Sequence, residues 1–272
     1  MNADAYLDRI GLSETAEALD PTVDALSRLL TAHARRVPFE NLAIVGHPRT
    51  DAPGPGISLR LPDLFGKIVT RRRGGFCFEV NGLFHWLLDE VGFDVDRCSA
   101  RIGGDENSLG RPPANHHTNV VHLDRRYIAD VGTGIPQVRV PVPLDGTVVA
   151  DEAGARWRVD PSEKPLSDHA LRLQRPGAEE WELRYRFRTT PRALSYFEAT
   201  CEYLANEPDG TFTSGPVVQR STADGAIRLD EDTLTRYEGG TETAEPVAAA
   251  DWTRVLEEEF RIRLDGENSG NR

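Results

Sequence analysis

Cys77 has the sequence surroundings that most favour nucleophilic chemistry in this 272-residue chain. It follows Gly74 and Gly75, and an apolar stripe with the i, i+3, i+4, i+7 spacing of a helix runs on from Val80 to Val91. Backbone N–H groups and the positive end of the helix dipole favour a thiolate at such a start. The glycines allow a tight turn and leave the sulfur approachable. We therefore predict a reactive cysteine at a helix N-terminus.

A free cysteine is more often a small buried hydrophobe than a catalyst, so Cys77 needs chemical partners. Two polar clusters lie downstream, at residues 115–121 and 127–134, and both are flanked by β-forming residues. The short polar segment 123–126 joins them, which predicts a β-hairpin. Such a hairpin can present a histidine from one strand and a carboxylate from the other. Cysteine, base and orienting acid are the parts of an activated nucleophile.

Four motifs in this order resemble the arylamine N-acetyltransferase family. Residues 73–81 match its Arg-Gly-Gly-x-Cys-x-Glu-x-Asn signature, and residues 37–42 resemble its Pro-Phe-Glu-Asn-Leu segment. Residues 6–11 are similar to its N-terminal segment, and residues 130–134 match the Asp-Val-Gly strand. The resemblance covers about residues 5–140 and fades afterwards.

The resemblance implies that Cys77 is the nucleophile, a hairpin histidine the base and Asp130 the residue that holds that histidine. The family's spacing from a proline and to an asparagine selects His116. A two-residue contraction of the hairpin would instead select His117. His122 alternates with apolar neighbours and is expected to face outward.

The resemblance also implies a ping-pong reaction with acetyl-coenzyme A as acyl donor and an arylamine or hydrazine as acceptor. Phe39, Phe76 and Thr133 are the expected acceptor contacts. Thr133 stands where the family usually has phenylalanine, which suggests a roomier or more polar site.

Coenzyme A is a polyanion, whereas the chain carries a formal net charge of −12 and has a pI near 5.1. Local features must therefore recruit it. The segment Gly132-Thr133-Gly134 is one candidate, because exposed backbone N–H groups can cradle phosphates, although an ordinary turn explains it equally well. We interpret the basic run 71–73 as a solvated face or a structural pairing, and Glu79 as an ion-pair partner of Arg73 or a helix cap.

Composition excludes several classes of protein. A hydrophobic content of 39% excludes general disorder, no stretch approaches the length of a membrane span, and the first residues lack the pattern of a signal peptide. Three scattered cysteines fit neither a disulfide framework nor a zinc cluster, so we expect no metal and a cytoplasmic protein. The acidic balance excludes a nucleic-acid footprint. The sequence does not determine the oligomeric state.

The basic residues are almost all arginine, since Lys67 and Lys164 are the only two lysines among 32 basic side chains. An acidic, lysine-poor surface suits a protein adapted to salt. A genome of high GC content gives the same bias. Highest stability at low salt would count against the first explanation.

The elements follow a coarse order of helices first and strands later, which predicts an α+β fold. Asp20-Pro21 resembles the start of a helix, residues 43–66 a long surface connection and residues 181–187 a strand with one buried face. Ser195 to Glu198 offers a capping box, and Asp251 begins a final helix. The resemblance implies a helical bundle over 1–92, a β-barrel over 93–190 and an α/β lid over 191–272, around a cysteine-protease-like Cys-His-Asp core.

Two rival functions remain open at this stage. A cysteine hydrolase or transglutaminase-like enzyme would use the same three groups and differ in what receives the acyl group. A binding module that merely retains the scaffold is the other alternative, and it is disfavoured because all three positions are filled.

Overall fold

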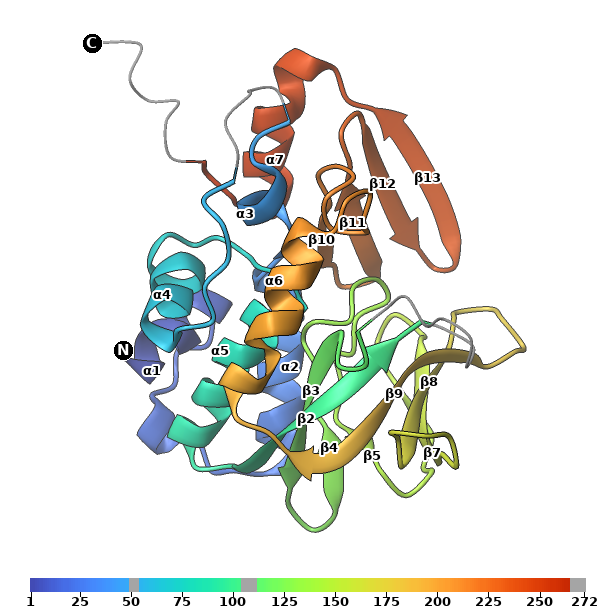
Figure 1. Ribbon diagram of the computed structural model, residues 1–272. Helices are drawn as coiled ribbons and strands as arrows, with labels where there is room; N and C mark the ends of the chain where they lie inside the picture. Colours follow the sequence, from blue (N-terminus) through green and yellow to red (C-terminus); the bar gives the residue numbers. More distant parts are fainter. Residues whose placement is uncertain (49–53, 104–111, 265–272) are drawn as a thin grey trace.

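The computed structural model of the protein describes residues 1–48, 54–103 and 112–264. Within these ranges, helices gather on one side, and two antiparallel sheets, of eight and five strands, lie on the other (Figure 1). The predicted α+β fold, with helices before most of the strands, is confirmed.

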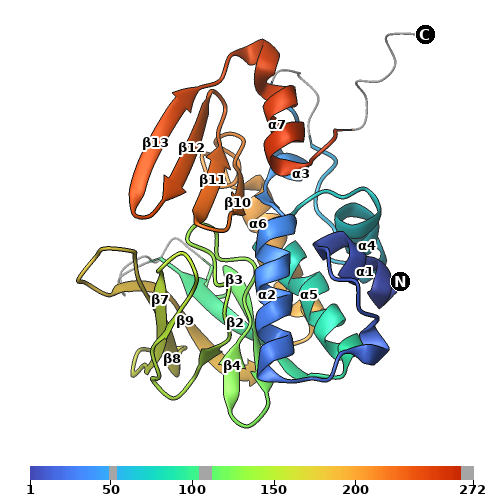
Figure 2. The ribbon, with the colours of Figure 1, turned by 180° about the vertical axis from the view of Figure 1, so that it is seen from behind.

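Three helices form the N-terminal layer: α1 (Ala3–Ile10), α2 (Val23–Arg36) and α5 (Cys77–Val91). Their apolar faces share one core. Helix α5 contacts α1 and α4 (Leu61–Phe65) on one side and strands β2 (Asp94–Ile102) and β3 (His116–His122) on the other, so it is buried almost throughout. Helix α2 lies on the rear face (Figure 2). The prediction that a helix begins at Cys77 is confirmed.

The predicted start of α2 was wrong by two residues. Thr22, not Asp20, is the N-cap, because its side chain accepts a hydrogen bond from the Ala25 N–H at 3.2 Å. Thr22 has the extended backbone that a cap requires, and it directly precedes the apolar stripe.

The segment 43–66 was predicted to be a surface connection and instead contains short helices. These are α3 (Leu42–Val45) and α4 (Leu61–Phe65), and the π-helical turn η2 (Gly66–Thr70) follows α4 directly. One further short element, η1 (Ala16–Ala18), lies between α1 and α2. Leu64 and Ile68 from this region are buried in the helical core, which fixes α4 and η2 against α5. Residues 49–53 lie outside the described part of the chain.

The larger sheet has the strand order β5-β4-β3-β2-β9-β8-β7-β6. Contact between β5 and β7 curls it around a core that includes Trp157, Tyr185 and Phe187, which confirms the expected barrel-like architecture. Its strands are β2 (Asp94–Ile102), β3 (His116–His122), β4 (Arg126–Ile128), β5 (Val142–Pro143), β6 (Val149–Ala150), β7 (Arg156–Pro161), β8 (His169–Gln174) and β9 (Glu182–Pro191).

Two sequence predictions concern this sheet. The hairpin is confirmed, since β3 and β4 pair antiparallel around residues 123–125. The strand predicted over residues 181–187 is β9, but only Tyr185 and Phe187 are fully buried. Trp181 precedes the strand and lies under the guanidinium of Arg158, 4.4 Å from its ring centre, rather than in the core.

The smaller sheet has the order β1-β10-β11-β12-β13. Its strands are β1 (Phe39–Glu40), β10 (Val218–Ser221), β11 (Gly225–Leu229), β12 (Thr233–Glu238) and β13 (Thr241–Pro246). Helix α7 (Trp252–Phe260), preceded by η4 (Ala249–Asp251), packs on it. Strand β1 comes from the N-terminal third of the chain, so it crosses between two of the predicted domains. The predicted domain boundaries at residues 92 and 190 stay a prediction.

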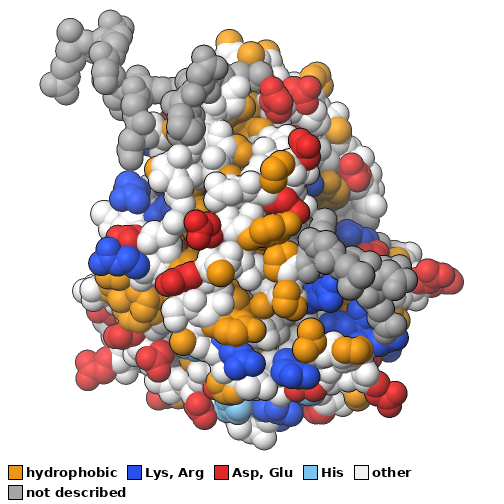
Figure 3. All heavy atoms as spheres, in the orientation of Figure 1, with side chains coloured by type: hydrophobic (Ala, Val, Ile, Leu, Met, Phe, Trp, Pro, Cys, Tyr) orange, Lys and Arg blue, Asp and Glu red, His pale blue; other side chains and the backbone are white. Residues whose placement is uncertain are grey.

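Helix α6 (Glu198–Asn206) crosses the front of the molecule between the helical layer and the sheets (Figure 1). A band of hydrophobic side chains runs down this face (Figure 3). The predicted capping box is wrong, because Ser195 lies inside the 3-10 turn η3 (Leu194–Phe197) and Phe197 occupies the N-cap position. Buried Phe197 and Cys201 hold α6 against the start of α5.

Candidate active site

The start of α5 is held by a capping arrangement around Cys77, its first residue. The Glu79 carboxylate accepts the Phe76 N–H at 3.1 Å, and the Glu79 N–H donates to the Phe76 carbonyl at 2.9 Å. Glu79 therefore faces back along the helix, as its predicted capping role requires.

The ion-pair partner of Glu79 is Lys67, at 2.8 Å, and not Arg73 as the alternative prediction had it. Arg73 instead reaches Glu40 of β1 at 2.9 Å. The cause is the π-helical turn η2, which places Lys67 beneath the start of α5. Lys67 also lies 3.8 Å from Glu40, so buried Glu40, Lys67 and Glu79 form one connected network with the partly buried Arg73.

Gly74 and Gly75 bring this loop close to the segment that carries β1. A Cβ on Gly74 would lie 2.1 Å from the Pro38 carbonyl oxygen, and Gly75 forms a backbone bridge with Phe39. Only glycine permits this approach. The loop before Cys77 is thus joined to the wall that Phe39 forms.

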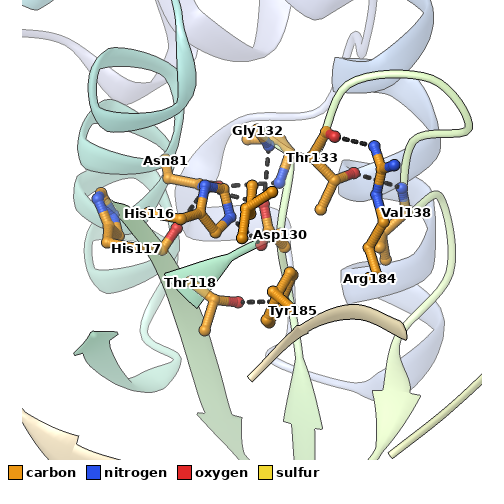
Figure 4. Close-up of polar contacts among 12 residues, drawn as sticks. Asn81, His116, His117, Thr118, Asp130, Gly132, Thr133, Val138, Arg184 and Tyr185 are labelled. Carbon is orange, nitrogen blue, oxygen red and sulfur yellow. Dashed lines mark hydrogen bonds and ion pairs between the residues drawn. The ribbon is translucent and has the colours of Figure 1, made fainter. Parts of the chain in front are cut away.

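His116 and Asp130 form a fully buried pair, with 2.7 Å between His116 Nε2 and Asp130 Oδ2 (Figure 4). The other Asp130 oxygen accepts from Asn81 and from the Gly132 N–H, both at 2.8 Å. Burial alone would raise the pKa of Asp130, but His116 and these donors outweigh it and hold the pKa at about 2. Asp130 is therefore ionised at neutral pH.

The second ring nitrogen of His116 is available as a proton acceptor. Nδ1 is buried and makes no hydrogen bond with any residue that the structure describes. Because Nε2 faces a carboxylate, the proton of a neutral imidazole resides on Nε2 and the Nδ1 lone pair is free to accept another.

Asn81 joins α5 to this pair, a role that was not predicted from the sequence. Its Nδ2 also donates to the His117 carbonyl at 2.7 Å, and its Oδ1 accepts the Val131 N–H at 2.8 Å. The available signal was its position four residues after Cys77, which places both side chains on one helix face.

The segment after Asp130 lies directly against Cys77. A Cβ on Gly132 would come within 2.9 Å of Cys77 Cα and 2.7 Å of Asn81 Nδ2. Burial raises the pKa of the Cys77 thiol well above its usual range, with smaller contributions from Cys201 and Asp130. The N–H of Phe78 lowers it through a hydrogen bond, without reversing the direction. Helix position alone therefore does not make Cys77 a resting thiolate.

His117 points to the opposite face of β3 from His116, away from Asp130 (Figure 4). Its ring lies between Phe78 and Phe197, at 6.1 and 5.0 Å between ring centres, and neither nitrogen has a partner among the described residues. Burial holds its pKa well below the usual value. His122 is partly exposed, as predicted, and bonds Asp96 at 2.9 Å.

Cys77 lines a cavity of about 310 Å³. We call it the Cys77 cavity, and its walls are formed by Phe39, Cys77, Ile102, Asn115, Gly132, Thr133, Gly134, Ile135, Arg184, Leu204, Glu207, Thr211, Phe212, Val217, Gln219 and Arg228. Of the expected contact residues, Phe39 and the segment 132–134 reach it. Phe76 does not line it, because its ring is fully buried against Phe78 and Phe212.

The expected phosphate cradle at residues 132–134 is only partly available. The Gly132 N–H is already bonded to Asp130, and Arg184 donates to the Thr133 carbonyl. The Thr133 hydroxyl accepts the Val138 N–H at 3.3 Å (Figure 4). Several polar groups of this turn are therefore already engaged in hydrogen bonds within the protein.

Comparison with known proteins places this geometry in a family. A family model described as N-acetyltransferase matches residues 22–269, and a curated arylamine N-acetyltransferase from Mycolicibacterium smegmatis is 33% identical over 246 residues, covering 88% of this chain and 84% of the relative. The chain belongs to the arylamine N-acetyltransferase family.

A relative from outside the bacteria and a solved structure support the same family. Human arylamine N-acetyltransferase 1 is 29% identical, covering 97% of this chain and 95% of the relative. The structure of Mycobacterium marinum arylamine N-acetyltransferase in complex with CoA superposes with a TM-score of 0.82 at 28% identity, covering 96% of this chain and 93% of that one. The chain is therefore an acyltransferase of this family.

Two further findings concern metal binding and membrane spans. In the described ranges, no group of three or more histidine, cysteine or acidic side chains is arranged to bind a metal ion. Among the described helices, none combines the length and apolar character needed to cross a bilayer.

Proposed function

We propose that this family member transfers an acetyl group from acetyl-coenzyme A to the nitrogen of an arylamine, a hydrazine or a related amine, through an acetyl-Cys77 intermediate. The observation that carries the proposal is the buried His116–Asp130 pair, which Asn81 ties to the helix that begins at Cys77. Three free cysteines and no disulfide among the described residues support a reducing, cytoplasmic setting.

In the first half-reaction, His116 Nδ1 takes the proton of the Cys77 thiol as the sulfur attacks the thioester carbonyl. The raised pKa of Cys77 makes this base necessary, because the thiol does not ionise unaided at neutral pH. Transfer within the pair creates two opposite charges side by side, which costs less in a buried site than an isolated thiolate. The hydrogen bond between thiol and imidazole forms as substrate enters, since catalytic contacts tighten in the complex.

Asp130 does not titrate in this cycle. With its pKa at about 2 it stays ionised, keeps the Nε2 tautomer and stabilises the imidazolium. The tetrahedral oxyanion is stabilised by backbone N–H groups at the start of α5, those of Cys77 and Phe78. Coenzyme A then leaves as its sulfur receives the proton from His116.

In the second half-reaction, the amine nitrogen attacks the acetyl carbonyl while His116 removes its proton. The C–S bond breaks, and Cys77 recovers a proton from His116 as the acetylated amine leaves. Phe39, Leu204 and Phe212 offer apolar surface for an aromatic ring. Thr133, in place of the family's usual aromatic residue, leaves that part of the cavity more polar.

Mass spectrometry after brief exposure to acetyl-coenzyme A tests the proposal. We expect one acetyl group on Cys77 and its removal by aniline-type amines or hydrazines. Cys98→Ala is a matched control, because Cys98 is equally buried but lies in the core of the larger sheet. A protein that never acquires the acetyl group, or that passes it only to water, would overturn the proposal and favour a hydrolase.

A further inference from the structure

The main chain at Val131 joins the acid of the catalytic pair to the wall of the Cys77 cavity. Val131 lies between Asp130 and Gly132. Asp130 binds His116, and Gly132 packs directly against Cys77 (Figure 4). A shift of the Val131 peptide groups would therefore change the separation between the base and the nucleophile.

The two polar groups of Val131 are held from opposite sides. Its N–H donates to Asn81 Oδ1 at 2.8 Å, which fixes it to helix α5. Its carbonyl accepts a hydrogen bond from Gln137 Nε2. Gln137 is only 5% exposed, so solvent does not readily replace this bond once it is lost.

The other end of the Gln137 amide reaches the smaller sheet. Its Oε1 accepts from Ser221 Oγ at 3.2 Å, and Ser221 is a buried residue of strand β10. A continuous chain of hydrogen bonds therefore runs from β10 to α5 through Ser221, Gln137, Val131 and Asn81. A buried polar network whose members are satisfied holds its groups rigidly.

Strand β10 also supports the loop that precedes the nucleophile. It pairs with Phe39 of β1, and Phe39 forms a backbone bridge with Gly75, two residues before Cys77. The same strand thus braces the Cys77 loop through β1 and the Val131 segment through Gln137.

The position of Gln137 requires an amide. The Val131 carbonyl needs a donor, whereas the Ser221 hydroxyl needs an acceptor. A glutamine side chain supplies both groups at one end, while an ionised glutamate supplies only acceptors and an apolar side chain supplies neither.

Arg139, two residues further along, provides an internal comparison. Its guanidinium donates to the Thr222 carbonyl and, at 3.1 Å, to the Gly225 carbonyl, and it lies 3.5 Å from Asp151. Arg139 therefore ties the same segment to the turn between β10 and β11. Its hydrogen bonds and ion pairs with described residues do not include Val131.

We propose that Gln137 is a positioning residue, which holds the Asp130–Gly132 main chain at the separation from Cys77 that acetyl transfer needs. This inference rests on the proposed function and extends the site to strand β10 of the smaller sheet. Gln137 is not among the residues that line the Cys77 cavity, so it acts through the Val131 main chain and not by touching substrate.

Two rates test the inference: alkylation of Cys77 by iodoacetamide, located by peptide mass spectrometry, and kcat for acetyl transfer. Alkylation needs only the sulfur and its base, because the thiolate is the nucleophile. Gln137→Met keeps the length of the side chain and removes both hydrogen bonds. Both rates should fall about tenfold, the value of one buried hydrogen bond, while KM changes less than about twofold.

A double-mutant cycle tests the link to β10. Ser221→Ala removes the far end of the chain and should slow Cys77 alkylation less than Gln137→Met does, because the bond to Val131 remains. Added to Gln137→Met, it should slow alkylation no further. Effects that multiply would mean that Ser221 acts independently of Gln137, and they would overturn the proposed chain.

Arg139→Gln is the matched control for a looser attachment of the smaller sheet. It should lower the unfolding free energy in urea but leave Cys77 alkylation within about twofold of wild type. Equal slowing in Arg139→Gln and Gln137→Met would overturn the inference, and so would a destabilised Gln137→Met with both rates unchanged.

Two further outcomes are distinguishable. If Gln137→Met does not fold, Ser221→Ala compared with Arg139→Gln decides the question, since only the first should slow alkylation. Failure of the proposed function looks different, because wild-type Cys77 is then alkylated but never acquires an acetyl group from acetyl-coenzyme A.

Discussion

Asn81 Nδ2 donates to Asp130 Oδ1 at 2.8 Å while His116 occupies the other oxygen of the same carboxylate. The nucleophile's helix and the base's strand are therefore fixed to each other through one side chain. The positions of Cys77 and His116 depend on this contact, although Asn81 touches neither sulfur nor substrate in the proposed reaction.

Asn81→Ala should weaken both stability and turnover. It leaves the Val131 N–H and the His117 carbonyl buried without partners, which should cost about 2–4 kcal/mol of unfolding free energy. Urea unfolding and kcat measure the two effects. Asn119→Ala is the control, because Asn119 donates to the Asn81 carbonyl at 3.2 Å but does not contact Asp130. Asn119→Ala should lose a similar amount of stability but show a much smaller loss of kcat. An equal kcat in the two variants would refute the positioning role of Asn81.

Asp130→Asn should abolish most activity without changing the shape of the site. An amide presents an N–H or a neutral oxygen to Nε2, so the tautomer is no longer fixed, and a fall in kcat of about 10³–10⁴ is expected. The wild-type pKa of about 2 lies below the unfolded value, so ionised Asp130 contributes stability above about pH 4 that is lost as the pH falls toward 2. The acid limb of the pH–rate profile near neutrality therefore does not report Asp130. Near-normal kcat in the variant would contradict the role.

His33 should make the protein sensitive to mild acid. Its ring is fully buried between Tyr6 and Phe84, with no hydrogen bond to a described residue, and burial lowers its pKa to about 3. The unfolded chain binds a proton near pH 6.5 that the folded protein resists until about 3, so stability falls as the pH drops through this window. The loss is at most about 1.4 kcal/mol per pH unit. His33→Leu should flatten the plot of unfolding free energy against pH by that slope, and an unchanged slope would count against it.

Part of this structure could be predicted from local sequence patterns, and the rest depends on contacts between residues that are distant in sequence. The helix that begins at Cys77 and the hairpin that bears His116 follow from periodicity and turn composition, which act within a few residues. The ion pair between Lys67 and Glu79 could not be predicted in this way, because their contact depends on a π-helical turn and on how that turn packs under α5. The Asn81–Asp130 bond likewise exists only once α5 has docked on β3.

The buried network beneath Cys77 gives the sharpest stability prediction. Lys67→Met removes the cation that lies 2.8 Å from Glu79 and 3.8 Å from Glu40, leaving two buried carboxylates to share Arg73. Breaking a buried pair in this way should cost about 3–5 kcal/mol at pH 7. Burial already raises the pKa of Glu79, and loss of Lys67 should raise it further. Because a raised carboxyl pKa lets the folded variant bind a proton first, its deficit should shrink as the pH falls from 7 toward 5.

The matched control for this network is Lys164→Met, which changes the only other lysine, at an exposed position. Its unfolding free energy should stay within about 0.5 kcal/mol of wild type. The double variant Lys67→Met with Glu79→Gln should recover part of the loss at pH 7, since it removes the unpaired charge, and its pH dependence should return toward that of wild type. A deficit in Lys67→Met that is the same at pH 5 and pH 7 would mean that lost packing, and not an uncompensated carboxylate, destabilises the start of the Cys77 helix.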